Sequence, residues 1–521
     1  MRVRLVPFRA LVTAVAALVA AGCGGEGSGT DPATVAPADT PIYIDVAVRP
    51  EGELQENVEA LASNLAGIDN LGGFVIEMIE ESASDDGEEF DYEKEVEPWL
   101  GERAGIALQD FDGEDFNGYA IAAAATDTGA AQEFIDDNAD EVVEEPSYEG
   151  VDFKVEEDGT AVGLVGDSFV LAETEAAFKA AIDAETGESL ADQDTYTSAT
   201  DAASSGSFAN LFVDIGGLIE EAGGTIDPEV EEFLETAGIE AKKATALASI
   251  VPGSDFIEVD FATDLFSEQV PTGDPSELLG SLPGGSLAAA AAADFGAQLN
   301  EAIDELDENG IPGELEPNEL KSALKSKGID LDRISESITD LGFFVQGSTE
   351  RNLTGAVVLT TKDAEEAENT VANIGLLLRA EGTPGITKIS EDGISGFSIK
   401  AEDPGDQPFV LAAKENKIAI AYGPIGAAAV LTAGKSATLA DNPAFQQAGD
   451  ALGDTPLSAF IAGPATMALV DNLISPEEQE DLAEIRPLLD KIEYVALGGG
   501  SEGDLATSKL VIGFEPDSDE E

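Results

Sequence analysis

The sequence contains no histidine, and its single cysteine, Cys23, stands near the start of 521 residues. The absence of histidine excludes Ser-His-Asp and Cys-His catalysis and the common zinc sites. A single cysteine allows no disulfide within the chain. Any catalysis would therefore have to use carboxylates, and we expect a protein that is not an enzyme and has no catalytic residues, metal site or cofactor.

Basic residues are scarce, at 25 Lys and Arg against 106 Asp and Glu. Three of those arginines lie within the first nine residues, so the chain from Cys23 onward has 22 basic residues against 106 acids, a net charge of −84. Nucleic acid binding depends on cationic neutralisation of phosphate and is excluded. Docking on anionic lipid through a basic face is excluded as well. Self-repulsion of this size opposes compaction unless salt or divalent cations screen it, so divalent cations stay open as partners.

No apolar run is long enough for a transmembrane helix. The longest, residues 10–21, is interrupted only by Thr13 and has about a dozen residues, whereas a spanning helix needs roughly 20. With basic residues ahead of it and small residues at 20–22, it predicts a cleavable signal peptide over residues 1–22.

The small residues before Cys23 resemble the lipobox of bacterial lipoproteins, although Ala20 stands where leucine is commoner. This resemblance implies that Cys23 is lipidated and becomes the first residue of the mature chain. Lasting attachment needs more than one acyl chain. We therefore expect a protein anchored to the cell membrane through N-terminal acyl chains, on its extracytoplasmic face.

The rest of the chain divides by composition. Residues 23–40 hold the cysteine and a flexible tether rich in Gly, Ser, Thr, Pro and Ala. Short alternating apolar runs interrupted by helical stretches then predict a first α+β domain with a largely antiparallel sheet at 41–266. A Pro- and Gly-rich linker is expected at 267–285, a second α+β domain at 286–514, and a charged tail at 515–521.

The two domains share a sequence pattern. SLADQDTYTSATDAA at 189–203 is matched by TLADNPAFQQAGDAL at 438–452, an offset of 249. Neighbouring apolar runs follow in the same order, including 169–172 with 418–421. A period near 250 is far longer than solenoid repeats, so we interpret it as two homologous domains.

These features together resemble a known family. The lipobox, the segment Pro-Ala-Asp-Thr-Pro-Ile-Tyr at 37–43, Trp-Leu-Gly-Glu at 99–102 and the tandem α+β body are similar to bacterial secreted proteins known only as a domain of unknown function. The resemblance covers nearly the whole chain. It implies a location in the cell envelope and brings no catalytic residues with it.

One stretch has the spacing of a calcium-binding loop. Glu305, Asp307, Asn309, Gly310 and Glu316 occupy positions 1, 3, 5, 6 and 12 of that pattern. The glutamate at position 1 and a proline at position 8 depart from it. Such spacings arise by accident among 106 acids, so we favour a solvated acidic connection and leave calcium binding open.

Two further motifs lack the context that their chemistry needs. Residues 499–503 match G-x-S-x-G, but they lie between two expected strands instead of on a strand-to-helix elbow. Gly434-Lys435-Ser436 ends an incomplete P-loop that follows a helical run, which favours a helix end. Trp99, the only tryptophan, is expected in the core.

We therefore expect a lipid-anchored envelope protein that acts as a non-enzymatic binding or scaffolding module. Two alternatives remain open at this point. One is a carrier or chaperone for an apolar ligand, which would need a large apolar cavity. The other is a carboxylate-based hydrolase, which would need acids converging in a cleft.

Overall fold

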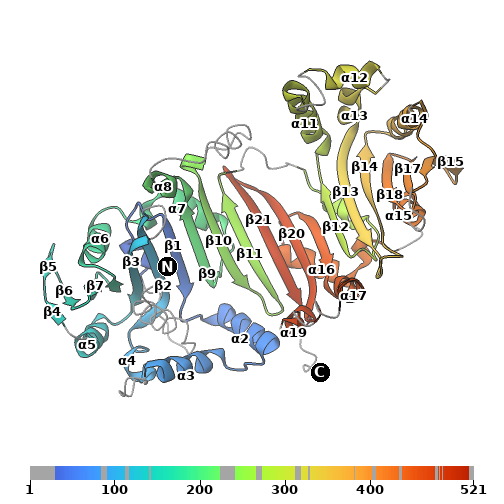
Figure 1. Ribbon diagram of the computed structural model, residues 1–521. Coiled ribbons are helices and arrows are strands. Elements are labelled where there is room, and N and C mark those ends of the chain that lie inside the picture. The colour runs from blue at the N-terminus through green and yellow to red at the C-terminus, as the bar shows by residue number, and fades with distance from the viewer. Residues whose placement is uncertain are drawn as a thin grey trace. The chain divides into compact units, whose positions relative to one another are not determined.

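The computed structural model describes most of the chain between residues 30 and 515 (Figure 1). The described residues are 30–83, 91–111, 116–139, 142–222, 241–265, 273–310, 318–326, 329–380, 382–401, 407–432, 437–475, 479, 482–483 and 485–515. The chain forms two compact units. Unit 1 comprises residues up to 269 together with 501–508, and unit 2 comprises 270–500 together with 509–515.

Unit 1 combines a long antiparallel sheet with short helices. Its elements in chain order are η1 (Pro32–Val35), β1 (Ile42–Ala47), α2 (Gly52–Ala66), α3 (Leu71–Ala83), α4 (Tyr92–Glu95), β2 (Leu100–Phe111), β3 (Phe116–Ala125), α5 (Thr128–Asn138), β4 (Val142–Glu144), β5 (Ser147–Tyr148), β6 (Val151–Glu156), β7 (Ala161–Val165), β8 (Ser168–Ala172), α6 (Glu175–Thr186), η3 (Leu190–Asp192), α7 (Asp194–Ala202), β9 (Ala209–Asp214), α8 (Ile215–Glu221), η4 (Ala241–Lys243), β10 (Thr245–Pro252) and β11 (Phe256–Thr263). The strand order is β4-β6-β7-β8-β3-β2-β1-β9-β10-β11.

Unit 2 is built in the same way. Its elements are α10 (Ser276–Gly280), β12 (Ala288–Ala292), α11 (Phe295–Asn309), α12 (Leu320–Ser326), α13 (Leu331–Ser337), β13 (Ile338–Gln346), β14 (Thr354–Thr361), α14 (Ala364–Ala380), β15 (Ile386–Glu391), β16 (Ile394–Ile399), β17 (Phe409–Lys414), β18 (Lys417–Tyr422), α15 (Pro424–Leu431), η6 (Leu439–Asp441), α16 (Pro443–Leu452), β19 (Leu457–Ala462), α17 (Gly463–Leu473), α19 (Arg486–Leu489) and β20 (Ile492–Glu502). The strand order is β15-β16-β17-β18-β14-β13-β12-β19-β20. The last strand, β21 (Leu505–Phe514), contributes residues to both units.

Local sequence signals explain where elements begin and end. Gly67 adopts φ 68° and ends α2, a conformation in which glycine carries no Cβ penalty. Asp127 caps α5 by accepting hydrogen bonds from the backbone N–H groups of Gly129 and Ala130. Along β1, Tyr43 and Asp45 are buried while their neighbours are half-exposed, the period of two expected of a strand with one face in the core.

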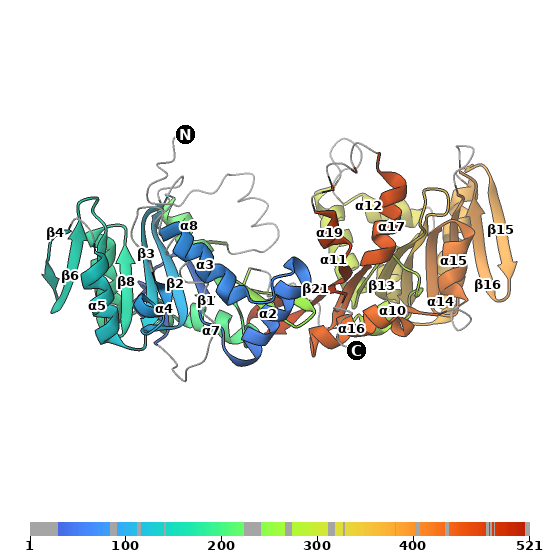
Figure 2. The ribbon, with the colours of Figure 1, turned by 90° about the horizontal axis from the view of Figure 1, so that it is seen from below.

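The cores of both units lie between sheet and helices. In unit 1, one sheet face packs Tyr43 and Phe212 against α7, and the opposite face packs Trp99 with Phe134 of α5. Figure 2 shows α5 in front of the β6–β8 end of that sheet. In unit 2, α14 covers the β16–β18 end through Phe397. The expected α+β class with largely antiparallel sheets is therefore confirmed.

Several predicted boundaries are wrong. We placed residues 23–40 in a flexible tether, but η1 lies in that range and buries Ala33 and Val35 completely or nearly so. The predicted linker 267–285 contains α10, and the adjoining Leu282 is fully buried. Burial of these apolar side chains stabilises the ordered conformation of both segments, although they are rich in proline and glycine.

Two further assignments need correction. Residues 501–508 belong to unit 1 and not to the second domain that we predicted at 286–514. The glycines at 67, 72 and 73 predict a break between two helices in the stretch 53–82; Gly67 makes that break, whereas Gly72 and Gly73 lie inside α3. The predicted signal peptide at 1–22, Cys23 and tail residues 516–521 lie outside the described residues.

Candidate functional site

The first five positions of the calcium-like spacing, 305–309, are helical, and residues 311–316 lie outside the described residues. Glu305, Asp307 and Asn309 belong to the last turns of α11, and Gly310 ends that helix with φ 73°. Residues two apart on a helix point about 200° away from each other, so the carboxylates of Glu305 and Asp307 lie on different faces of α11. Glu316 lies outside the described residues. The described part of the spacing therefore lacks the loop form of a calcium site, and the acidic connection remains the favoured interpretation.

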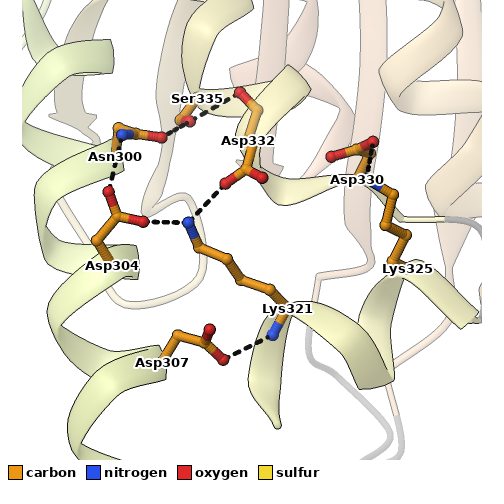
Figure 3. A network of polar contacts seen from close by, with 8 residues as sticks. All are labelled: Asn300, Asp304, Asp307, Lys321, Lys325, Asp330, Asp332 and Ser335. Atoms are coloured by element: carbon orange, nitrogen blue, oxygen red, sulfur yellow. Dashed lines mark hydrogen bonds and ion pairs between the residues drawn. The ribbon is translucent and has the colours of Figure 1, made fainter. Parts of the chain in front are cut away.

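The positively charged side chain of Lys321 lies among the acids of this region (Figure 3). The ammonium of Lys321 on α12 contacts the carboxylate of Asp304 on α11 and lies 2.6 Å from Oδ1 of Asp332 on α13. The backbone N–H of Lys321 also donates to Oδ1 of Asp307, at 3.0 Å. These hydrogen bonds and the nearby carboxylates raise the pKa of Lys321, so it stays charged.

Neighbouring polar groups extend the network in Figure 3. Asn300 donates through Nδ2 to Asp304, at 3.2 Å, and accepts from the hydroxyl of Ser335, at 2.8 Å. Lys325 pairs with Asp330 at 2.9 Å, and this pair lowers the pKa of Asp330. Lys321 joins all three helices, so the acids that suggested a metal site serve to hold α11, α12 and α13 together. Across the described part of the chain, no three Asp or Glu side chains are arranged to hold a metal ion.

A second charged centre is enclosed in unit 1. Asp45 lies opposite Gly105 and Asn210 in the sheet, and its carboxylate contacts the Arg103 guanidinium. Asn210 donates to Asp45 at 2.9 Å, and Arg103 donates to the carbonyl of Ser207 at 3.0 Å. Gly105 is required here, since a Cβ would stand 2.1 Å from the Tyr43 hydroxyl oxygen. Asp45 is buried, whereas the Arg103 side chain is 29% exposed, and both hydrogen-bond with neighbouring parts of unit 1.

The remaining predicted residues have structural positions. Trp99 is buried between Phe134 and Phe169, with ring centroids 5.4 and 5.3 Å away, so its expected place in the core is confirmed. Residues 499–502 belong to β20, and Gly503 makes the following turn with φ 59°, which excludes a nucleophile elbow. Gly434, Lys435 and Ser436 lie outside the described residues, although the helical run before them is α15 as expected.

An apolar row crosses the sheet of each unit. In unit 1, directly paired residues form the row Phe261, Ala248, Leu211, Ile44, Ile106, Ile121 and Leu171. In unit 2, the row is Leu497, Ala459, Ala290, Phe343, Val357, Ile420, Leu411 and Phe397. One end of the unit 2 row is covered by α14.

Several residues of these rows are open to solvent, although Ile121 in the unit 1 row is only 2% exposed. Leu211 and Phe261 are 39% and 42% exposed, and Phe343, Ile420 and Leu497 are 40%, 46% and 41% exposed. The sequence did contain a signal for this, because strands such as Thr245–Pro252 are apolar at successive positions and not only at alternate ones.

The described residues thus define an α+β protein with antiparallel sheets. Its charged clusters connect elements of the fold, and each unit has a partly exposed apolar row. The chain belongs to the family described as "Protein of unknown function (DUF3352)", whose model matches residues 25–510. No curated protein matches the chain. Among the helices that the structure describes, each is too short or too polar to cross a bilayer.

Two crystal structures of TP0453 are similar to part of the chain. Crystal form IV has 10% identity and a TM-score of 0.26, and covers 46% of this chain and 83% of its own. Crystal form III has 8% identity and a TM-score of 0.25, with 46% and 81% covered. Likeness at this level carries no conclusion about activity or ligand.

Proposed function

We propose that this protein is a non-enzymatic binding or scaffolding module, anchored to the outer face of the cell membrane through acyl chains on Cys23. The observation that carries the binding role is the exposed apolar row of each unit. Exposed apolar patches mark interaction surfaces. The two rows are partly exposed although the chain has 106 acids among 521 residues with which to cover its surface. The anchor is supported by the sequence around Cys23.

We also propose that the two units arose by duplication. The order β9-β1-β2-β3-β8 in unit 1 has its counterpart in β19-β12-β13-β14-β18 of unit 2. A capping box opens a short 3-10 turn in each, formed by Ser189 with Asp192 and by Thr438 with Asp441. A duplicated body would present two comparable apolar rows on one anchored chain, which suits a scaffold.

The anchor is tested by expressing the full chain in a bacterial host that processes lipoproteins. We expect mass spectrometry to find an N-terminal Cys23 carrying two or three acyl chains, and the protein to sediment with membranes. Cys23→Ser should release the protein into the soluble fraction. An unmodified thiol at Cys23 in the membrane-bound protein would reject the anchor.

The binding surface is tested with N-phenyl-1-naphthylamine, a neutral apolar dye whose fluorescence rises on apolar surfaces. We expect Phe343→Glu and Leu211→Glu each to lower the dye signal of the mature protein, because each places a charge in an apolar row. Leu376→Glu is the matched control, since Leu376 of α14 is 63% exposed but lies outside both rows. Equal effects of all three substitutions would count against the rows as the surface.

A further inference from the structure

Helix α15 is apolar on all sides, yet one side faces solvent. Its sequence, Pro-Ile-Gly-Ala-Ala-Ala-Val-Leu at 424–431, contains no polar side chain. Gly426, Ala427, Val430 and Leu431 are buried against the sheet, whereas Ile425 is 64% exposed. A helix that is apolar all round is normally enclosed by protein, so the outer side of α15 lacks a covering layer.

Helix α6 in unit 1 provides the comparison. It follows β8, the strand paired with β3, just as α15 follows β18, the strand paired with β14. Its outer side carries charge: Lys179 pairs with Glu175 at 2.8 Å and lies over the ring of Tyr148, whose hydroxyl donates to Asp183 at 3.3 Å. The two helices occupy equivalent places in the fold, but the outer side of α6 is charged whereas that of α15 is apolar.

A groove of about 480 Å³ runs beside the exposed side of α15. Its lining includes Pro283 to Gly285, Gln346 of β13, and Ile425, Ala428, Ala429 and Thr432 of α15. Among the residues that the structure describes, every one that lines the groove is uncharged, and Gln346 is the largest polar side chain. Gly284 and Gly285 have no side chain, and the side chains of Ala428 and Ala429 are small. The backbone of another helix therefore has room to approach closely.

We propose that this groove is a docking site for an amphipathic helix of a partner protein, with an apolar side that fills the groove and basic residues along its flanks. The inference rests on the proposed binding function and names a partner class for it. Apolar anchors at helical spacing are the usual way in which a helix occupies such a groove.

Charge complementarity selects the basic flanks. The mature chain carries −84, so a second copy or another anionic partner approaches against strong repulsion. A cationic partner is attracted by the same field, which raises its association rate. The uncharged groove then favours the apolar side of that partner, because burying an unpaired charge there is costly.

The test uses an 18-residue helical peptide with leucines on one side and lysines on the other, labelled with fluorescein. Its anisotropy is measured against the mature full-length protein in 0.15 M and 1 M NaCl. We expect binding to persist at 1 M NaCl, and Ile425→Glu and Ala428→Glu each to raise Kd at least tenfold. An added glutamate by itself attracts a cationic peptide, so this loss reports the apolar contact.

Ala176→Glu on α6 is the matched control, and we expect its Kd to stay within twofold of the unmodified protein. Circular dichroism and thermal melting of each variant establish that it is folded. Unchanged or tighter binding by folded Ile425→Glu protein would overturn the proposal, and so would complete loss of binding to the unmodified protein at 1 M NaCl.

Two other outcomes separate this inference from the proposed function. Weaker binding by Leu497→Glu together with unchanged binding by Ile425→Glu would place the peptide on the sheet, which overturns the α15 site and leaves the binding role standing. Binding of neutral phosphatidylcholine vesicles through Ile425, without binding of the peptide, would assign the groove to lipid and overturn the helix as occupant.

Discussion

The ammonium of Lys321 lies 2.6 Å from the carboxylate of Asp332, and it also contacts Asp304 on a different helix. One cation therefore stands between two acids that would otherwise repel each other across α11 and α13. These two acids are therefore used for contacts between helices.

Removing this cation should loosen the three helices. We expect Lys321→Ala to lower the urea midpoint of the mature protein, because Asp304 and Asp332 then face each other without a shared partner. Lys325→Ala is the control, since it removes a single pair, with Asp330, and Lys325 is 66% exposed. A drop for Lys325→Ala as large as that for Lys321→Ala would contradict the bridging role.

The Asp45–Arg103 pair of unit 1 should contribute more to stability than an exposed ion pair does. Asp45→Ala leaves the Arg103 guanidinium without its carboxylate in a mostly buried place, and breaking such a pair costs about 3 kcal/mol of unfolding free energy. Asp136→Ala removes the Asp136–Lys154 pair, whose carboxylate is 57% exposed, and should cost less than about 1 kcal/mol. Urea denaturation followed by circular dichroism measures both. Similar losses of unfolding free energy for the two variants would show that burial does not determine how much each ion pair contributes to stability.

Asp31 predicts a particular pH dependence. Asp31 is exposed at the surface, but desolvation by the surrounding protein still raises its pKa, so its ionised form is less favourable in the folded state than in the unfolded state. Asp31→Asn should therefore be more stable than the unmodified protein near pH 7. The advantage should shrink as the pH falls through the raised pKa, and vanish once Asp31 is protonated in both states. Asparagine can still accept the capping hydrogen bond from Ala33 N–H, so the cap serves as an internal control.

Asp192 should behave in the opposite way. Hydrogen bonds from the backbone N–H and hydroxyl of Ser189 lower the pKa of Asp192. Its contribution to stability is present above the unfolded-state pKa and is lost as the pH falls through the folded-state pKa. Asp192→Asn should thus reduce stability near pH 7 and have less effect in strong acid. A melting series from pH 2.5 to 7 checks both Asp31→Asn and Asp192→Asn, and parallel curves would contradict these assignments.

The only tryptophan gives a direct measure of packing in unit 1. Trp99 packs between Phe134 and Phe169, and its Nε1 donates to the carbonyl of Glu95 at 2.8 Å. Trp99→Ala should reduce the free energy of unfolding by about 3 to 5 kcal/mol, as expected for a large buried aromatic side chain. Trp99→Phe keeps most of the volume and should lose clearly less. Equal losses would indicate that the hydrogen bond dominates over packing.

The strands and the buried tryptophan were predictable because alternation of apolar residues reflects burial on one sheet face. The alternating run at 42–48 became β1, and Trp99 entered the core. The tether and linker were misassigned because proline and glycine are common in coil and also lie within or beside short helical segments such as η1 and α10. Only the contacts of Val35 and Leu282 with the core distinguish the two cases.

The candidate surfaces were less accessible to prediction. Nothing in the neighbourhood of Lys321 in sequence indicates that its ammonium reaches Asp304, 17 residues away, because three separate helices determine that meeting. The apolar rows depend on strand register, which pairs Phe343 with Val357 and Leu211 with Ile44. Composition alone could have singled out α15, since a helix without any polar side chain needs an explanation.

Residues 501–508 belong to unit 1, although they follow nearly all of unit 2 in the sequence. Unit 1 is therefore discontinuous along the chain, and a fragment that ends at residue 269 would lack one of its segments. Shortening the chain ahead of residue 501 would thus remove contacts from the first unit as well as from the second.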